Sequence, residues 1–90
     1  MPGSQRLDAT AVLEHVRALA QRATQIAASI QRADATFEPT GEPLDQLARR
    51  LVAGEIVGLQ LRFFLDDAWC RDTLLRAPES FRLVRVREGN

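Results

Sequence analysis

The sequence contains no lysine, and all twelve of its basic side chains are arginine. Twelve acidic side chains balance them, so the formal net charge is zero. We attribute the missing lysine to genome composition. Proteins that phosphate contacts hold to nucleic acid carry a basic excess, and neither half of this chain has one. We therefore expect nucleic acid to be a disfavoured partner.

Cysteine and histidine are almost missing, since Cys70 and His15 are the only examples of each. A lone cysteine cannot form an intrachain disulfide, and the two residues together cannot supply a structural zinc site. The sequence also lacks a glycine-rich phosphate loop, an HExxH helix motif and a calcium loop. We expect no metal, no cofactor and no catalytic residue, and we interpret Cys70 and His15 as structural.

Long hydrophobic runs are absent as well. No window approaches eighteen apolar residues, the length that a membrane-spanning helix needs. The first ten residues lack the apolar run of a signal peptide. We expect no membrane association and a protein of the bacterial cytoplasm.

The apolar residues from Val12 to Ala33 follow one another at alternating spacings of four and three. This pattern is typical of a helix that packs along one stripe, and Asp8 is a suitable N-cap for it. We predict a loose arm over residues 1–7 and a helix of about 25 residues after it. The helix either covers the protein's own sheet or pairs with a second copy in a homodimer. The residues predicted to form that dimer seam are Val16, Leu19, Ala23, Ile26 and Ile30.

A second, shorter helix is predicted from Pro43 to Ala53, followed by Gly54 as a residue able to adopt positive φ. Beyond it the apolar spacing changes to a period of two, which predicts three strands near residues 55–65, 69–77 and 81–87. Residues 8–90 should therefore form one α+β domain with the order ααβββ, in which the strands make an antiparallel meander.

The strand register decides which residues share a face. We favour a three-residue loop from Asp66 to Ala68, which places Arg62 opposite Asp72 as a favourable cross-strand pair. A two-residue loop would place Leu61 opposite Asp72 instead. In the favoured register, a partner-binding face consists of Arg62, Phe64, Asp72, Leu74, Arg76, Arg82 and Val84.

Apolar side chains among arginines are typical of the centre of a protein interface. We therefore expect a non-enzymatic accessory, adaptor or regulatory protein that binds a larger partner protein, as a homodimer. Burial of this face between two separated helices would remove the patch. Two alternative functions remain: a nucleic-acid-binding regulator that uses the Arg and Phe side chains of the face, and a small-molecule-binding domain with a pocket lined by Phe63 and Trp69.

Overall fold

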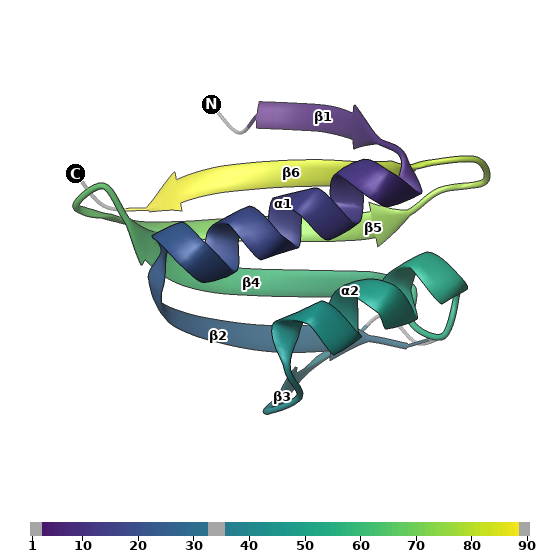
Figure 1. The fold of residues 1–90 in the computed structure, drawn as a ribbon, viewed down its shortest axis with the longest axis horizontal. Helices are drawn as coiled ribbons and strands as arrows, with labels where there is room; N and C mark the ends of the chain where they lie inside the picture. The colour runs from purple at the N-terminus through teal and green to yellow at the C-terminus, as the bar shows by residue number, and fades with distance from the viewer. Residues whose placement is uncertain (1–2, 33–35, 89–90) are drawn as a thin grey trace.

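The computed structural model describes residues 3–32 and 36–88, which form two helices and a six-stranded antiparallel sheet (Figure 1). The elements in chain order are β1 (Gly3–Leu7), α1 (Ala9–Arg22), β2 (Thr24–Gln31), β3 (Phe37–Thr40), α2 (Leu44–Ala53), β4 (Gly58–Leu65), β5 (Ala68–Arg76) and β6 (Phe81–Glu88). The strands lie side by side in the order β1-β6-β5-β4-β2-β3. Both helices lie on the same face of this sheet (Figure 1).

The α+β class is confirmed, but the predicted order ααβββ with a three-stranded meander is wrong. The three C-terminal strands exist and form the middle of a larger sheet. Residues 3–7 of the predicted arm form the edge strand β1, and residues 37–40 of the predicted connection form β3 on the opposite edge. Residues 1–2 of the arm lie outside the described residues.

The first helix is also shorter than predicted, with 14 residues, and ends at Arg22. Its C-cap, Ala23, already has an extended backbone. The residues that follow alternate between the faces of β2, so that Ala28 and Ile30 are buried while their neighbours are not. Thr24, Ile26 and Ile30 are β-branched and favour a strand. Ala33, the last residue of the predicted helical pattern, lies outside the described residues.

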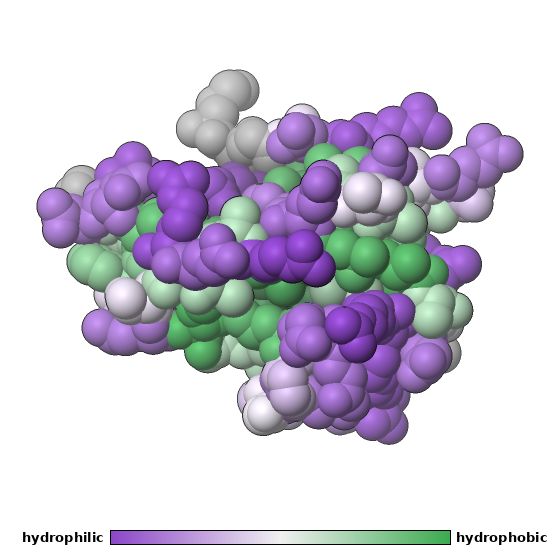
Figure 2. All heavy atoms as spheres, viewed as in Figure 1, coloured by the Kyte–Doolittle hydropathy of each residue, from purple (hydrophilic) through white to green (hydrophobic). Residues whose placement is uncertain are grey.

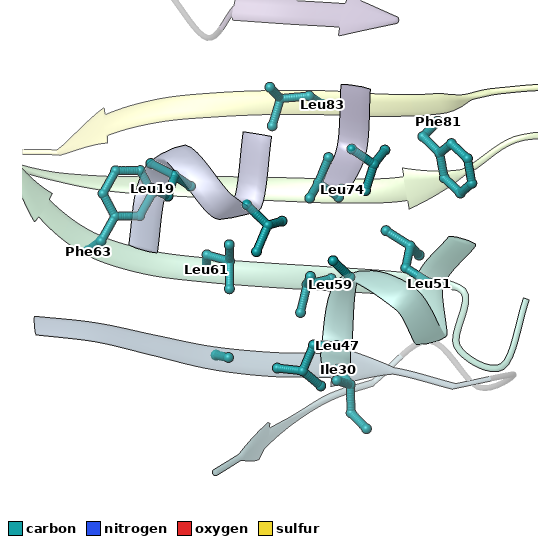
Figure 3. Packing of buried hydrophobic residues seen from close by; sticks show 14 of the residues in the cluster. Leu19, Ile30, Leu47, Leu51, Leu59, Leu61, Phe63, Leu74, Phe81 and Leu83 are labelled. Atoms are coloured by element: carbon teal, nitrogen blue, oxygen red, sulfur yellow. The ribbon is translucent and has the colours of Figure 1, made fainter. Parts of the chain in front are cut away.

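Local signals set the ends of both helices. The Asp8 carboxylate accepts a hydrogen bond from the Ala11 amide at 2.8 Å, as an N-cap does. The second helix agrees with its prediction: Pro43 precedes it, and Gly54 ends it with φ of 83°. Apolar side chains of the two helices pack onto the sheet, where Leu59, Leu61 and Phe63 of β4 are fully buried (Figure 3).

The turn between β4 and β5 has two residues, so the predicted three-residue loop is wrong. Asp66 and Asp67 have φ of 51° and 62°, which is the geometry of a type I′ hairpin turn. Leu61 therefore faces Asp72, the register that the sequence analysis did not favour. Because side chains alternate, this one-residue shift moves every side chain of β5 to the other face.

The predicted strands near 69–77 and 81–87 imply a three-residue loop at 78–80 that pairs Phe81 with Ala77, but Phe81 pairs with Arg76. This loop therefore also differs by one residue from the prediction. The two shifts cancel, so β6 presents the faces that were predicted for it. Phe81 and Leu83 are buried in the core, and Arg82 and Val84 lie on the opposite side.

Candidate functional site

We call the side of the sheet that carries no helix the open face. The registers of the strand pairs place equivalent residues of neighbouring strands on it. Its central side chains are Gln60, Arg62 and Phe64 of β4, Trp69, Arg71, Thr73 and Leu75 of β5, and Arg82, Val84, Val86 and Glu88 of β6. Ser4 and Arg6 extend it on β1, and Ala27, Ser29, Phe37 and Pro39 extend it on β2 and β3.

An aromatic pair occupies one end of the open face. The rings of Phe64 and Trp69 lie edge to face, with centroids 5.5 Å apart and an interplanar angle of 67°. The Arg62 guanidinium carbon lies 4.7 Å from the centroid of Trp69, a cation–π distance. A cation therefore lies over one side of the Trp69 ring.

The charge on this face is strongly unbalanced. Its described strand residues include four arginines and one acidic residue, Glu88. Two of the arginine pairs are directly cross-strand: Arg62 faces Arg71, and Arg6 faces Arg82. Like charges in direct opposition destabilise a sheet. The open face thus carries a positive charge that the net charge of the chain conceals.

Glu79 lines the same hollow as Arg6 and Arg82 but forms no ion pair with either of them. Glu88 is the acidic side chain that lies beside Arg62 and Arg71. Its two carboxylate oxygens lie 3.4 Å from Nε of Arg62 and 3.4 Å from Nη1 of Arg71. Arg6 and Arg82 have no ion-pair partner within residues 3–32 and 36–88. One arginine pair is therefore partly neutralised, and the other is not.

The structure brings together four of the seven residues predicted for partner binding: Arg62, Phe64, Arg82 and Val84. Asp72 and Leu74 are on the helix side instead and are fully buried, because the two-residue turn reverses the faces of β5. Arg76 also leaves the patch, since its Nη1 lies 3.5 Å from the Leu51 carbonyl oxygen at the end of α2.

The residues that β5 contributes to the open face were not predicted from the sequence; they are Trp69, Arg71, Thr73 and Leu75. Thr73 accepts a hydrogen bond from the Gln60 amide at 3.2 Å across the strands. A signal for this register was available in Asp66 and Asp67, since Asp tolerates positive φ and two such residues suit a type I′ turn.

Asp72 forms an ionic cluster beneath α1. Its oxygens accept from Nε and Nη2 of Arg85 at 2.7 and 2.8 Å, and Nε2 of His15 lies 2.7 Å from Oδ2. Burial alone would raise the pKa of the Asp72 carboxyl, but the hydrogen bonds from Arg85 and His15 and the Arg85 charge together lower it below 3.8. The same hydrogen bonds raise the pKa of Arg85. His15, interpreted from the sequence as structural, thus ties α1 to the sheet.

The residues of the predicted dimer seam do not share a helix. Val16 and Leu19 belong to α1, whereas Ile26 and Ile30 belong to β2. Val16, Leu19 and Ile30 are buried in the protein's own core, which leaves no continuous helical stripe for a second copy. Phe63 and Trp69 likewise lie on opposite faces of the sheet, so they cannot line one pocket.

The helix side has a furrow of its own, between α1 and α2. Apolar surface is visible there in Figure 2. The furrow holds a hollow of about 320 Å³, whose walls include Leu13, Ala20, Leu44 and Ala48. Its charged rim has both signs, with Arg17 and Arg49 against Asp45, so it shows no comparable charge selectivity.

Comparisons of the chain with protein-family models, with curated proteins and with solved structures gave no match. Among the described residues, no group of three or more His, Cys, Asp or Glu side chains is placed to hold a metal ion. The helices at residues 9–22 and 44–53 are both too short and too polar to cross a membrane. The open face is consequently the feature from which a function is inferred.

Proposed function

We propose that this protein is a non-catalytic accessory or adaptor module that binds a larger partner protein through the open face. The observation that carries the proposal is the placement of both helices on one side of a six-stranded sheet. The other side keeps a half-buried apolar centre, Phe64, Trp69, Leu75, Val84 and Val86, among arginines. Aromatic residues and arginine are the side chains that protein interfaces favour.

The size of the open face suits a single protein partner. Six strands at a spacing of about 4.8 Å give a width of roughly 24 Å, and strands of eight residues are about 27 Å long. Their product, roughly 650 Å², is an upper limit, because the edge strands β1 and β3 have only five and four residues. A partner that covered the whole face would therefore form an interface smaller than the ~800 Å² that each partner buries in a standard complex.

Single-stranded nucleic acid is the second candidate, and the excess of arginine on the open face favours it. Proteins of that class stack bases on exposed aromatic rings. Here the Arg62 guanidinium already covers the Trp69 ring at 4.7 Å, and Phe64 meets the same ring by its edge. This arrangement favours a protein ligand over a stacking ligand.

Site-specific photocrosslinking in the native cells tests the proposal. A benzophenone amino acid replaces Phe64 or Val84 on the open face, and Ala18 or Gln46 on the exposed sides of the helices as matched controls. We expect both open-face positions to crosslink to one and the same protein, and the helix positions to give no such product. Each variant is checked for native secondary structure by circular dichroism.

Two results would count against a protein partner. Products formed only from Ala18 or Gln46 would assign binding to the helix side. Products at Phe64 that nuclease digestion removes would assign the face to nucleic acid, and retention on an oligonucleotide column should then fall steeply as salt rises.

A further inference from the structure

We propose that the Arg62–Arg71 pair is a carboxylate-binding site, and that Glu88 occupies it in the free protein as an internal competitor of the partner. This inference rests on the proposed function and names the chemistry that the open face recognises: an acidic side chain, Asp or Glu, on the partner protein. The reasons are the opposition of the two arginines, the loose seating of Glu88 and the space around them.

The opposition of Arg62 and Arg71 requires an anion. The two residues are direct partners in the register of β4 and β5, and both side chains lie on the open face. A carboxylate between two guanidinium groups offsets their repulsion and can accept from both. The pair therefore forms a site whose stability depends on a negatively charged ligand.

Glu88 fills this role less tightly than the buried and half-buried ion pairs of the same molecule, and about as loosely as its exposed pairs at 3.4 and 3.6 Å. Its contacts to Arg62 and Arg71 are both 3.4 Å long. By contrast, Arg85 donates to Asp72 at 2.7 and 2.8 Å, and Arg50 donates to Glu42 at 2.6 Å. Tight charge-assisted hydrogen bonds are about 2.7–2.9 Å long. A carboxylate on a partner could therefore form shorter hydrogen bonds to Arg62 and Arg71 than Glu88 does.

The surroundings of the pair leave room for a ligand. A hollow of about 370 Å³ is lined by Arg62, Arg71 and Glu88 together with Ala27, Ser29 and Gln60. On the β2 side the hollow is bounded by the small side chains of Ala27 and Ser29, which take up little of its space. Arg62 and Arg71 are 55% and 41% exposed, so an incoming acidic side chain can reach both without displacing the core.

The second arginine pair, Arg6 and Arg82, favours a second acidic side chain on the partner protein. Arg6 and Arg82 face each other on β1 and β6 without an ion-pair partner among the described residues. Arg82 pairs with Leu75, four residues along β5 from Arg71, which corresponds to about 14 Å. A partner surface with two acidic groups at roughly that separation, and apolar residues between them, would match the open face.

A carboxylate is favoured over a phosphate because the molecule itself supplies a carboxylate to this site. Phosphate would satisfy the same two guanidinium groups, so it has to be distinguished by experiment. The single tryptophan of the chain is a natural reporter, because Arg62 lies over its ring. The indole N–H signal of Trp69 in an NMR spectrum should respond when Arg62 engages a ligand.

The test titrates the full chain with a blocked hexaglutamate peptide at low ionic strength, and with hexaglutamine as the neutral probe. We expect hexaglutamate to shift the Trp69 signal and hexaglutamine to leave it unchanged. Glu88→Gln should bind hexaglutamate about threefold more tightly, since it removes the internal competitor. Arg71→Gln should bind it about three- to tenfold more weakly, since one of the two cations is lost.

Matched controls lie on the other side of the molecule. Glu55→Gln and Arg49→Gln make the same chemical changes at exposed positions near or on α2, where each residue is in an ion pair of 3.4 or 3.6 Å. They should leave the affinity for hexaglutamate unchanged. An equal gain from Glu55→Gln and Glu88→Gln would reduce the effect to net charge and overturn the proposal.

Failure of this inference can be told from failure of the proposed function. If Phe64 and Val84 crosslink to a protein and the Arg71→Gln change leaves that product undiminished, the open face binds a protein but not through this carboxylate site. If a short oligothymidylate or inorganic phosphate shifts Trp69 at lower concentration than hexaglutamate, phosphate is the preferred ligand and the carboxylate assignment is wrong. Crosslinks absent from both open-face positions would refute the proposed function itself.

Discussion

Asp72 is the only buried polar or charged side chain within residues 3–32 and 36–88. It is fully buried, and its two oxygens receive three contacts of 2.7–2.8 Å from Arg85 and His15. Burying a carboxylate costs desolvation free energy. Removing the carboxylate by mutation also leaves the neighbouring cations without their partner. This residue therefore connects α1, β5 and β6 through charge, where the rest of the core connects them through apolar contact.

Asp72→Ala should lower the free energy of unfolding by about 3 kcal/mol, the low end for breaking a buried pair, because Arg85 is partly exposed and can regain water. Urea denaturation followed by circular dichroism measures this change. Asp45→Ala is the matched control: its pair with Arg49 at 3.6 Å is exposed, so the loss should stay below about 1 kcal/mol. Equal losses from the two variants would contradict a structural role for the cluster.

The lowered pKa of Asp72 predicts a pH dependence of stability. Because the folded-state pKa lies below the ordinary value of 3.8, the carboxylate stabilises the fold fully above that value. The contribution is lost as the pH falls through the lower, folded-state pKa. The difference in unfolding free energy between the wild type and Asp72→Asn should therefore be constant near pH 5 and shrink below about pH 4. Urea midpoints measured over this range provide the check, and a constant difference down to pH 2 would refute it.

Elements differ in how clearly their local sequence specifies them. Asp8, Pro43 and Gly54 are short-range signals, and the helix starts and the second helix end where they predict. The spacing of Val16, Leu19, Ala23 and Ile26 is ambiguous. Apolar residues at spacings of four and three also arise when a helix ends and an alternating strand follows it, as α1 and β2 do here. The helix was predicted too long because the pattern continued past its physical end at Arg22.

The turn at Asp66 and Asp67 is a place where a change of sequence should stabilise the fold. Both residues have positive φ, where an Asn-Gly pair is the best type I′ sequence. The double change Asp66→Asn and Asp67→Gly should raise the free energy of unfolding by about 0.5–1 kcal/mol. Thermal and urea unfolding measure it. Glu79→Gly, in a loop position whose φ is not positive, should bring no gain, and an equal gain there would show that the turn type is not the cause.

At the scale of the whole molecule, the two sides of the sheet should respond differently to a charge. Phe64→Asp on the open face should leave the protein folded and abolish partner binding, whereas Leu74→Asp should unfold it, because Leu74 is fully buried among apolar residues. Circular dichroism and the photocrosslinking assay separate the two outcomes. Unfolding by Phe64→Asp would show that the open face belongs to the core.

The homodimer expected from the sequence remains a prediction, although the helical seam on which it was based does not exist. Pairing two open faces would oppose four arginines and one glutamate per copy with the same set, which is electrostatically unfavourable. A dimer would therefore have to use another surface. Light scattering after size exclusion, at low and high salt, decides the oligomeric state.

The sequence by itself determined the α+β class, the second helix, the three C-terminal strands and the faces of β4 and β6. It placed Arg62 with Phe64 and Arg82 with Val84, because alternation along a strand is a local property. The two pairs share one face as predicted only because the two register errors cancel. Tertiary structure decided the length of the first helix, the two edge strands and the register of β5. These depend on which distant segment a strand meets, since a shift of one residue reverses a face without changing local composition. The register of β5 is therefore what places Trp69 and Arg71 on the open face and Asp72 in the core.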